Sequence, residues 1–254
     1  MRPFPSKVLV LLGAVACSSQ VLEPIVKGGG STWCASQTTS KTAYCRDFDD
    51  GRNYDVGWSS IYSEPMGIAF ATVECGNHAS DSAPCSLLVT TPQVLAGSSA
   101  SFQLQQLVES NSGVSLQFDL EIVNYDSGSP NVGLIAVYLQ TTKAWWLSLD
   151  IVGGEFQLTE TQDSPGDAGN HNYTTHKGGQ PILGSWHQVN LQLIANSSPL
   201  MASLSYDGNE VITPVTITPP ATPTQLLTQW GVNYVQGPAQ PMRLSYDNIK
   251  IDAL

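Results

Sequence analysis

Polar and apolar side chains alternate along most of the chain from about residue 86 to its C-terminal end. A period of two places successive side chains on opposite faces of an extended strand, so one face can be buried while the other meets water. This alternation is typical of antiparallel sheets that cover a core on one side. It is clearest in the segments Ser101–Leu107, Val114–Val123, Val132–Leu139, Trp145–Ile151, Glu155–Thr159, Trp186–Ile194, Met201–Tyr206, Gln229–Val235 and Met242–Ile251.

Turn-forming residues separate these segments. Gly153 and Gly154 stand between two of them, and Asp207-Gly208 follows Tyr206, where both residues tolerate the positive φ of a tight hairpin. No stretch keeps the 3.6-residue period of an amphipathic helix. We therefore expect an all-β protein, an antiparallel β-sandwich of the jelly-roll kind, with one domain over residues 33–254.

Composition excludes several other classes of protein. Charged residues make up 12% of the chain, about half the usual share of roughly 25%. This share excludes a coiled coil, a charge-rich helical bundle and an acidic disordered tail. The formal net charge is −11, which would repel the phosphate backbone of nucleic acids, so we expect no nucleic-acid partner.

The first 16 residues have the features of a signal peptide. Arg2 and Lys7 precede the apolar run Val8–Ala16, which at nine residues is too short for a membrane span; a span needs about 20 residues. The small residues before Cys17 resemble a bacterial lipobox, in which the cysteine becomes acylated; the alternative is an ordinary signal peptide cleaved after Ala16. No Asp follows Cys17, which resembles the pattern of lipoproteins exported to the outer membrane.

The lipobox resemblance implies a lipoprotein that is anchored in membrane lipid by palmitate-like acyl chains on Cys17. Residues 17–32 are rich in Gly and Ser at their end and would form a flexible tether. We therefore expect the protein in a bacterial cell envelope, at the outer membrane.

Cysteine count supports this compartment. Setting Cys17 aside leaves the four cysteines Cys34, Cys45, Cys75 and Cys85, an even set that an oxidising envelope would join as disulfides. Four cysteines allow three pairings, and we favour the local pairs Cys34–Cys45 and Cys75–Cys85 because short loops close at low entropic cost. Zinc is the alternative, but the spacing between Cys34 and Cys45 does not fit its usual Cys-x2-4-Cys pattern.

Three stretches of the chain carry a family resemblance. They are Cys45–Gly51 with Trp58 after it, Gly184–Leu191 with the hairpin Tyr206–Asn209 after it, and Tyr246–Ile251. In this order they resemble the opening strand, the Gly-x-Trp-His strand and the closing strand of the concanavalin A-like lectin/glucanase fold, and within it the laminin-G-like jelly rolls of bacterial surface proteins. The resemblance spans residues 45–254 and implies that the closing strand pairs near the first; a fold alone does not assign a function.

Acidic residues do not form the motif of a glycan-cleaving enzyme. Glucanases of this fold resemble one another in a strand bearing Glu-x-Asp-x-x-Glu or Glu-x-Asp-x-Glu, and neither motif occurs, nor do the lyase motifs Gln-Ile-His and Tyr-x-Lys-x-Gly. Asp119 and Glu121 share one face of a strand without a third acid, and we expect that face to be polar and outward. We expect Asp150 and Glu155, on either side of the Gly-Gly turn, at solvated strand ends. No enzyme assignment follows, and we expect a non-catalytic protein.

Calcium is the one cofactor that the resemblance suggests, as a structural ion near the first and last strands. Asp49, Asp50 and Asp247 occupy that neighbourhood, and carboxylate oxygens suit Ca²⁺. The alternative is that Asp49 and Asp50 belong to a turn and that Asp247 is a local cap. The spacing of the histidines matches no usual metal site: we interpret His171–His176 as part of a polar Gly-rich loop, with a metal or sugar contact as the alternative, and we expect His187 to face solvent.

Aromatic side chains are the candidates for a binding site. Trp145 and Trp146 are adjacent, so on a strand they must point to opposite faces, one into the core and one outward, where its ring could stack on a sugar. Trp145, Trp146, Asn172 and Tyr173 are the ligand-binding residues that we expect.

These observations predict an envelope-anchored, non-catalytic module that binds carbohydrate or another surface ligand. Its expected partners are membrane lipid, through acylated Cys17, and a polysaccharide or surface glycan. The alternatives are a structural or adhesive surface lipoprotein without a small ligand, and a glycan-cleaving enzyme with a non-standard site.

Overall fold

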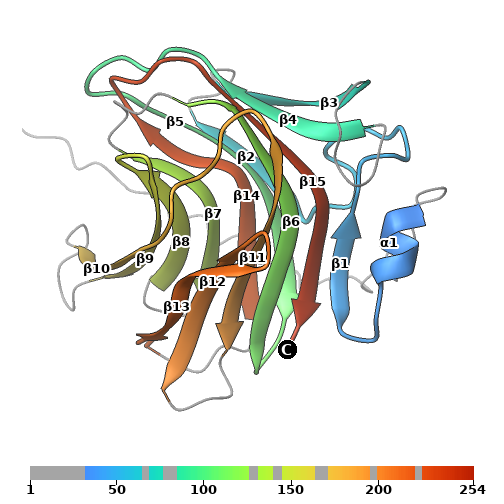
Figure 1. Ribbon diagram of the computed structural model, residues 1–254, viewed down its shortest axis with the longest axis vertical. Helices are drawn as coiled ribbons and strands as arrows, with labels where there is room; N and C mark the ends of the chain where they lie inside the picture. The colour runs from blue at the N-terminus through green and yellow to red at the C-terminus, as the bar shows by residue number, and fades with distance from the viewer. Residues whose placement is uncertain are drawn as a thin grey trace, which may run out of the picture.

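A computed structural model describes residues 32–64, 69–76, 85–125, 131–139, 145–163, 171–194, 199–220 and 225–254. Over these residues the chain forms two antiparallel sheets that face each other across a core (Figure 1). The expected all-β jelly-roll sandwich is therefore confirmed. The expected signal peptide, Cys17 and residues 17–31 of the expected tether lie outside the described residues.

Sheet A contains both the first and the last strand of the described residues. Its strands are β1 (Thr42–Arg46), β3 (Phe70–Cys75), β4 (Cys85–Thr91), β6 (Gly113–Asn124), β11 (Trp186–Ile194), β12 (Leu200–Tyr206), β13 (Asn209–Ile217) and β15 (Met242–Ala253). They run in the order β13-β12-β11-β6-β15-β4-β3, and β1 pairs with the second half of β15, beyond the half that pairs with β4. The closing strand thus pairs with the first, as the family resemblance implied, and Figure 1 shows β1 beside β15.

Sheet B covers the other side of the core. Its strands are β2 (Ser60–Glu64), β5 (Ser99–Glu109), β7 (Val132–Leu139), β8 (Trp145–Val152), β9 (Glu155–Asp163), β10 (His171–Lys177) and β14 (Gln225–Gln236). They run in the order β10-β9-β8-β7-β14-β5-β2, so β14 lies between β7 and β5 at the centre.

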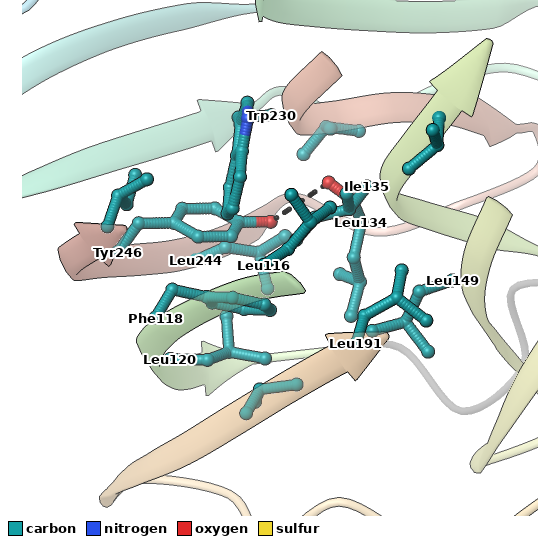
Figure 2. Close-up of a cluster of buried hydrophobic side chains, with 14 of the residues drawn as sticks. Leu116, Phe118, Leu120, Leu134, Ile135, Leu149, Leu191, Trp230, Leu244 and Tyr246 are labelled. Carbon is teal, nitrogen blue, oxygen red and sulfur yellow. Dashed lines mark hydrogen bonds between the residues drawn. The ribbon is translucent and has the colours of Figure 1, made fainter. Parts of the chain in front are cut away.

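The core is built by the inward-facing residues of both sheets, as the alternation predicts. Phe118 on β6 packs edge-on against Trp230 on β14, with ring centroids 5.3 Å apart (Figure 2). Tyr246 on β15 is fully buried, and its hydroxyl donates a hydrogen bond to the carbonyl oxygen of Gly231 at 2.8 Å. Burial raises the pKa of Tyr246, so the phenol stays neutral and joins the two sheets through this bond.

Both expected disulfides are present, and both belong to the sheet A side. Cys34–Cys45 fastens the short helix α1 (Thr32–Gln37) to β1, and Cys75–Cys85 joins the paired residues of β3 and β4. The local pairing predicted from the cysteine spacing is therefore confirmed. Among the described residues, no helix has the length and apolar character that crossing a membrane requires.

Two parts of the sequence form strands that the alternation did not predict. β1, β2 and β3 precede residue 85, and β10 occupies His171–Lys177, where we expected a polar loop. Within the part of the chain that the structure describes, β10 is an edge strand that pairs only with β9, and most of its side chains are exposed, so no apolar alternation marks it.

Candidate functional site

The outer face of sheet B, which points away from sheet A, carries aromatic and polar side chains. Alternation along β8 sends Leu147, Leu149 and Ile151 into the core, so the intervening Trp146 and Asp150 lie on the outer face. Residues paired across neighbouring strands share a face. The register of sheet B therefore shows which other side chains meet these two.

An aromatic row runs across four strands of this face; we use the name for Tyr138, Trp146, His171 and Tyr173. Trp146 stacks on Tyr138 of β7, with ring centroids 5.5 Å apart and planes inclined by 21°. On the other side it meets His171 edge-on at 5.4 Å, and His171 meets Tyr173 at 6.1 Å. Tyr173 is 63% exposed at the edge strand, so the row leads from a half-buried centre to an open edge.

The adjacent tryptophans divide as expected, one inward and one outward. Trp145 is fully buried, and its indole N–H donates to Glu160 Oε1 at 2.8 Å. A ligand cannot reach it, so the expectation that Trp145 contacts a ligand is wrong. Asn172 pairs in register with Gln162, which pairs with Trp145, so it lies on the opposite side of the sheet from the aromatic row.

Asp150 lies on the same outer face and is only 4% exposed. Its Oδ2 accepts hydrogen bonds from Ser148 Oγ at 2.9 Å and from Thr159 Oγ1 at 2.7 Å. Burial raises the pKa of Asp150 to about 6, although these two hydroxyls act in the opposite direction. The expectation of a solvated strand end is wrong, because β8 continues to Val152 and Asp150 is an interior position of the strand.

A chain of side-chain hydrogen bonds extends from the other edge of sheet B toward Asp150. Ser60 Oγ on β2 donates to Gln105 Oε1 at 2.6 Å, and Gln105 Nε2 donates to Gln103 Oε1 at 3.3 Å. Gln103 Nε2 in turn donates to the backbone oxygen of Asn233 on β14 at 3.1 Å. These bonds link three strands on the outer face of the sheet.

Asn233 reaches this face because β14 contains a bulge. Val232 and Val235 are both in the core, and β14 has one residue more than β5 between them, so Asn233 and Tyr234 both lie outside it. A Cβ placed on Gly133 would lie 3.2 Å from Asn233 Cβ and 3.3 Å from Asp150 Oδ1. Gly133 therefore separates Asn233 from Asp150, and we call Gln103, Asp150, Gln229 and Asn233 the polar cluster.

A second group of chemistry-bearing side chains lies at the end of β11. Ser185 Oγ is 2.7 Å from His187 Nε2, and His187 Nδ1 is 2.6 Å from Asp207 Oδ2. This is the connectivity of a Ser-His-Asp relay, but its other contacts are structural: Asp207 Oδ1 accepts the Gln188 N–H, and His187 stacks on Tyr206. We assign the group to holding the β12–β13 turn against β11.

The expectation that His187 faces solvent is wrong, since its side chain is 12% exposed. His187 shares the parity of Val189, which is in the core, and the outward neighbour on β11 is Trp186.

Asp119 of β6 also has a protein partner. Phe118, Leu120 and Ile122 are in the core, as expected, and Asp119 lies on the opposite face. It is nevertheless buried, and its Oδ2 accepts a hydrogen bond from Asn248 Nδ2 at 2.6 Å.

The carboxylates expected to bind calcium are engaged by donors of the chain. Asp50 forms ion pairs with Arg46 at 3.1 Å and with Arg52 at 3.6 Å. Asp49 Oδ1 accepts the Cys85 N–H, and Asp247 Oδ1 accepts the Asn248 N–H. Within the described ranges, no three His, Cys, Asp or Glu side chains form a group that could hold a metal ion, so we carry the calcium interpretation no further.

Sequence reasoning missed the polar cluster. The alternation of Ser148 and Asp150 with apolar neighbours could have placed both on an outer face. Gln103, Gln229 and Asn233 join them only through strand order and a bulge, which no local pattern displays.

Comparison with known proteins yields likeness of fold alone. No protein-family model matches the chain, and no curated protein matches it. Among solved structures, the chain is similar to the cellulose induced protein Cip1, with a TM-score of 0.55, 13% identity, and coverage of 83% of this chain and 97% of that one. It is also similar to domain 4 of AbnA, a GH43 extracellular arabinanase from Geobacillus stearothermophilus, solved in complex with arabinotriose, with a TM-score of 0.51, 16% identity, and coverage of 84% and 92%.

A third likeness is weaker. A botulinum neurotoxin type C chain matches with a TM-score of 0.49 and 10% identity over 84% of this chain. The match spans 48% of the neurotoxin chain, and we draw no argument from it.

Proposed function

We propose that the protein is a non-catalytic carbohydrate-binding module that holds a glycan on the outer face of sheet B. The aromatic row is the observation that carries this proposal, because Trp146 presents its ring between two other aromatic side chains on a face lined with polar groups. An aromatic ring packs against the apolar C–H face of a sugar, while polar neighbours bind its hydroxyls. Tyr173 extends the same surface to the edge of the sheet.

The similar folds support a glycan as the ligand. Domain 4 of AbnA was solved in complex with arabinotriose, and this chain covers 92% of that domain. The sequence lacks the paired-carboxylate motifs of glucanases, and for this reason we propose a binding module rather than a hydrolase, which requires two carboxylates placed across the glycosidic bond.

Retention on immobilised polysaccharides tests the proposal. The purified protein should be retarded by at least one of laminarin, mixed-linkage β-glucan, arabinan and xylan, without release of reducing sugar. Trp146→Ala should weaken the retention about 10-fold or more, since stacking aromatics dominate the binding energy of such surfaces. Trp186→Ala is the matched control, because Trp186 is a half-buried tryptophan on the outer face of sheet A.

Two results would replace this function with one of the alternatives. Release of reducing sugar that persists after repeated purification would indicate an enzyme. Absence of retention on every polysaccharide tested would favour a structural or adhesive protein.

We further propose that acylation of Cys17 anchors the module in a bacterial envelope. The apolar run Val8–Ala16 and the lipobox-like residues before Cys17 support this location. Labelled palmitate should enter the wild-type protein and not Cys17→Ser. Equal labelling of the two proteins would remove the anchor from the proposal and leave the binding face unaffected.

A further inference from the structure

The polar cluster combines deep burial with unused hydrogen-bonding atoms. Asn233 is 9% exposed and Gln229 is 7% exposed, yet among the described residues Asn233 Oδ1, Asn233 Nδ2 and Gln229 Oε1 have no hydrogen-bond partner. Buried polar atoms are nearly always paired in proteins, because leaving one unpaired costs free energy. Three such atoms on one face of one strand therefore point to a partner from outside the described part of the chain.

The backbone around these atoms is shaped to bring them together. β14 has its extra residue beside Asn233, and β7 has one residue more than β8 between Gly133 and Ile135. β-Bulges occur next to binding sites, where they re-aim side chains. Gly133 lies between the two bulges, and the Cβ that it lacks would press against both Asn233 and Asp150.

We infer that the polar cluster is a hydroxyl-binding subsite for a neutral glycan chain that runs across the strands of sheet B from the aromatic row. This inference rests on the function proposed above. Asn233 Oδ1, Gln229 Oε1 and Asp150 Oδ1 accept hydrogen bonds, and Asn233 Nδ2 donates them. Sugar hydroxyls both donate and accept, so one or two sugar units satisfy a set of this composition.

The charge of the cluster selects against acidic glycans. Asp150 brings a buried carboxylate with no cation among its hydrogen-bonding partners, so it would repel a uronate or a sulfated sugar. An ammonium group offers only donors and would leave Asn233 Nδ2 unpaired. Neutral hexoses and pentoses are the class of ligand that the cluster fits.

Ionised Asp150 is the acceptor in this subsite, so binding should weaken as the pH falls through the pKa of Asp150, which burial raises to about 6. On β7, Tyr138 stays neutral over this range because burial and the charge of Asp150 raise its pKa to about 12. β9 faces Asp150 with neutral Thr159 and Gln157, and β14 brings neutral Asn233 beside it. Titratable groups farther along the face include His171 of the aromatic row and Lys177, which pairs with Glu155.

Affinity electrophoresis of the purified protein tests the subsite, with laminarin, mixed-linkage β-glucan, arabinan and xylan as neutral probes and polygalacturonate as the acidic probe. The variants are Asp150→Asn, Asn233→Ala and Gly133→Ala, whose added methyl group fills the space between Asn233 and Asp150. Asp119→Asn is the matched control, since Asp119 is a buried carboxylate on sheet A, hydrogen-bonded to Asn248. Melting temperatures of all variants show that each one folds.

The expected result is retention of a neutral probe that weakens about 10- to 100-fold in Asp150→Asn and in Asn233→Ala, as expected for the loss of a hydrogen bond to a charged or buried group. Asp119→Asn should bind as the wild type does. Affinity should fall between pH 7.5 and 5 in the wild type; His171→Gln should keep this fall, and Asp150→Asn should lose it.

The outcomes separate the subsite from the function on which it rests. In one outcome, Trp146→Ala abolishes retention, but Asp150→Asn, Asn233→Ala and Gly133→Ala leave retention unchanged. This outcome would overturn the subsite and leave the proposed binding face in place. Retention of polygalacturonate above every neutral probe would also overturn the subsite. If the wild type binds no probe, both the proposed function and the subsite are overturned.

Discussion

Each sheet buries a carboxylate on its outer face, but the hydrogen-bonding surroundings of the two carboxylates differ. On sheet A, Asp119 receives a hydrogen bond of 2.6 Å from Asn248, and nearby Lys250 pairs with Asp252 at 2.8 Å. On sheet B, Asp150 is held by two hydroxyls, and Asn233 and Gln229 on the same face have polar atoms that no described residue pairs.

We interpret this difference as the one between a carboxylate buried for the fold and a carboxylate buried in the proposed subsite. A buried acid that is paired by donors of the chain helps to define the fold. On sheet A, Asn248 donates to Asp119, and on the same sheet Asp252 accepts a hydrogen bond from Thr42 and pairs with Lys250. A buried acid among unpaired neighbours reduces stability unless a ligand completes its bonds. Burial alone would not have distinguished the two sites.

The largest expected effect contrasts the two faces of β8. Trp145→Ala should lower the free energy of unfolding by about 3–5 kcal/mol, because it empties a fully buried position and removes the hydrogen bond to Glu160. Trp146→Ala should cost about 1 kcal/mol, since Trp146 is only half-buried on the outer face. Urea unfolding measures both, and equal losses would contradict the assignment of Trp146 to a binding face.

The next effect tests whether the disulfide of sheet A stabilises the protein without affecting binding at the proposed face of sheet B. Replacing both Cys75 and Cys85 by Ala should lower the free energy of unfolding by about 3 kcal/mol, the usual contribution of a disulfide that closes a short loop. Retention on a neutral polysaccharide should not change, because the bridge joins β3 and β4 of sheet A. A loss of binding by a folded double variant would show that the two faces are coupled.

Asp150→Asn should increase stability at neutral pH. The native pKa of Asp150 is about 6 against an ordinary value of 3.8, so between these values the native state holds a proton that the unfolded chain has released. Wild-type stability therefore decreases through this group as the pH rises from about 4 to 6, and the variant lacks this loss. The stability gained by the variant should grow over that window and level off at about 3 kcal/mol.

Unfolding curves of wild type and Asp150→Asn at pH 4, 5, 6 and 7.5 check the sign. A difference that does not grow with pH would mean that Asp150 is as well solvated as an ordinary surface acid. The same comparison for Asp119→Asn supplies the sheet A counterpart.

The smallest effect concerns the relay at the β12–β13 turn. Ser185→Ala should cost about 1 kcal/mol, the value of a single partly buried hydrogen bond to His187. Labelling of the wild type with a fluorophosphonate, absent from Ser185→Ala, would contradict the structural assignment of this group.

Much of the fold follows from local pattern. The alternation of β6, β8 and β11 already separates the core residues Phe118, Leu147 and Leu191 from their polar neighbours, and side-chain direction on a strand depends only on parity. β10 escaped prediction because an exposed edge strand has little need of apolar side chains. The local disulfides were predictable because cysteines close in sequence close small loops.

The site was only half predictable. Trp146 is marked by its neighbour Trp145, since two adjacent aromatics on a strand must diverge. Asp150 looked like a strand end because the Gly-Gly turn is close by, although β8 extends two residues beyond it. Asn233 and Gly133 are far apart in the chain, and their contact depends on the placement of β14 beside β7, which no short pattern encodes.

The extra residue of β14 determines which side chains can be changed on the outer face of sheet B by adding or removing a single residue. Because Val232 and Val235 both enter the core, the bulge presents Asn233 and Tyr234 together on the outside, which an unbroken strand cannot do. Deleting one residue here would restore strict alternation and withdraw one of the two from the surface. The composition of the proposed subsite can thus change by insertion or deletion at one point, with every other side chain kept.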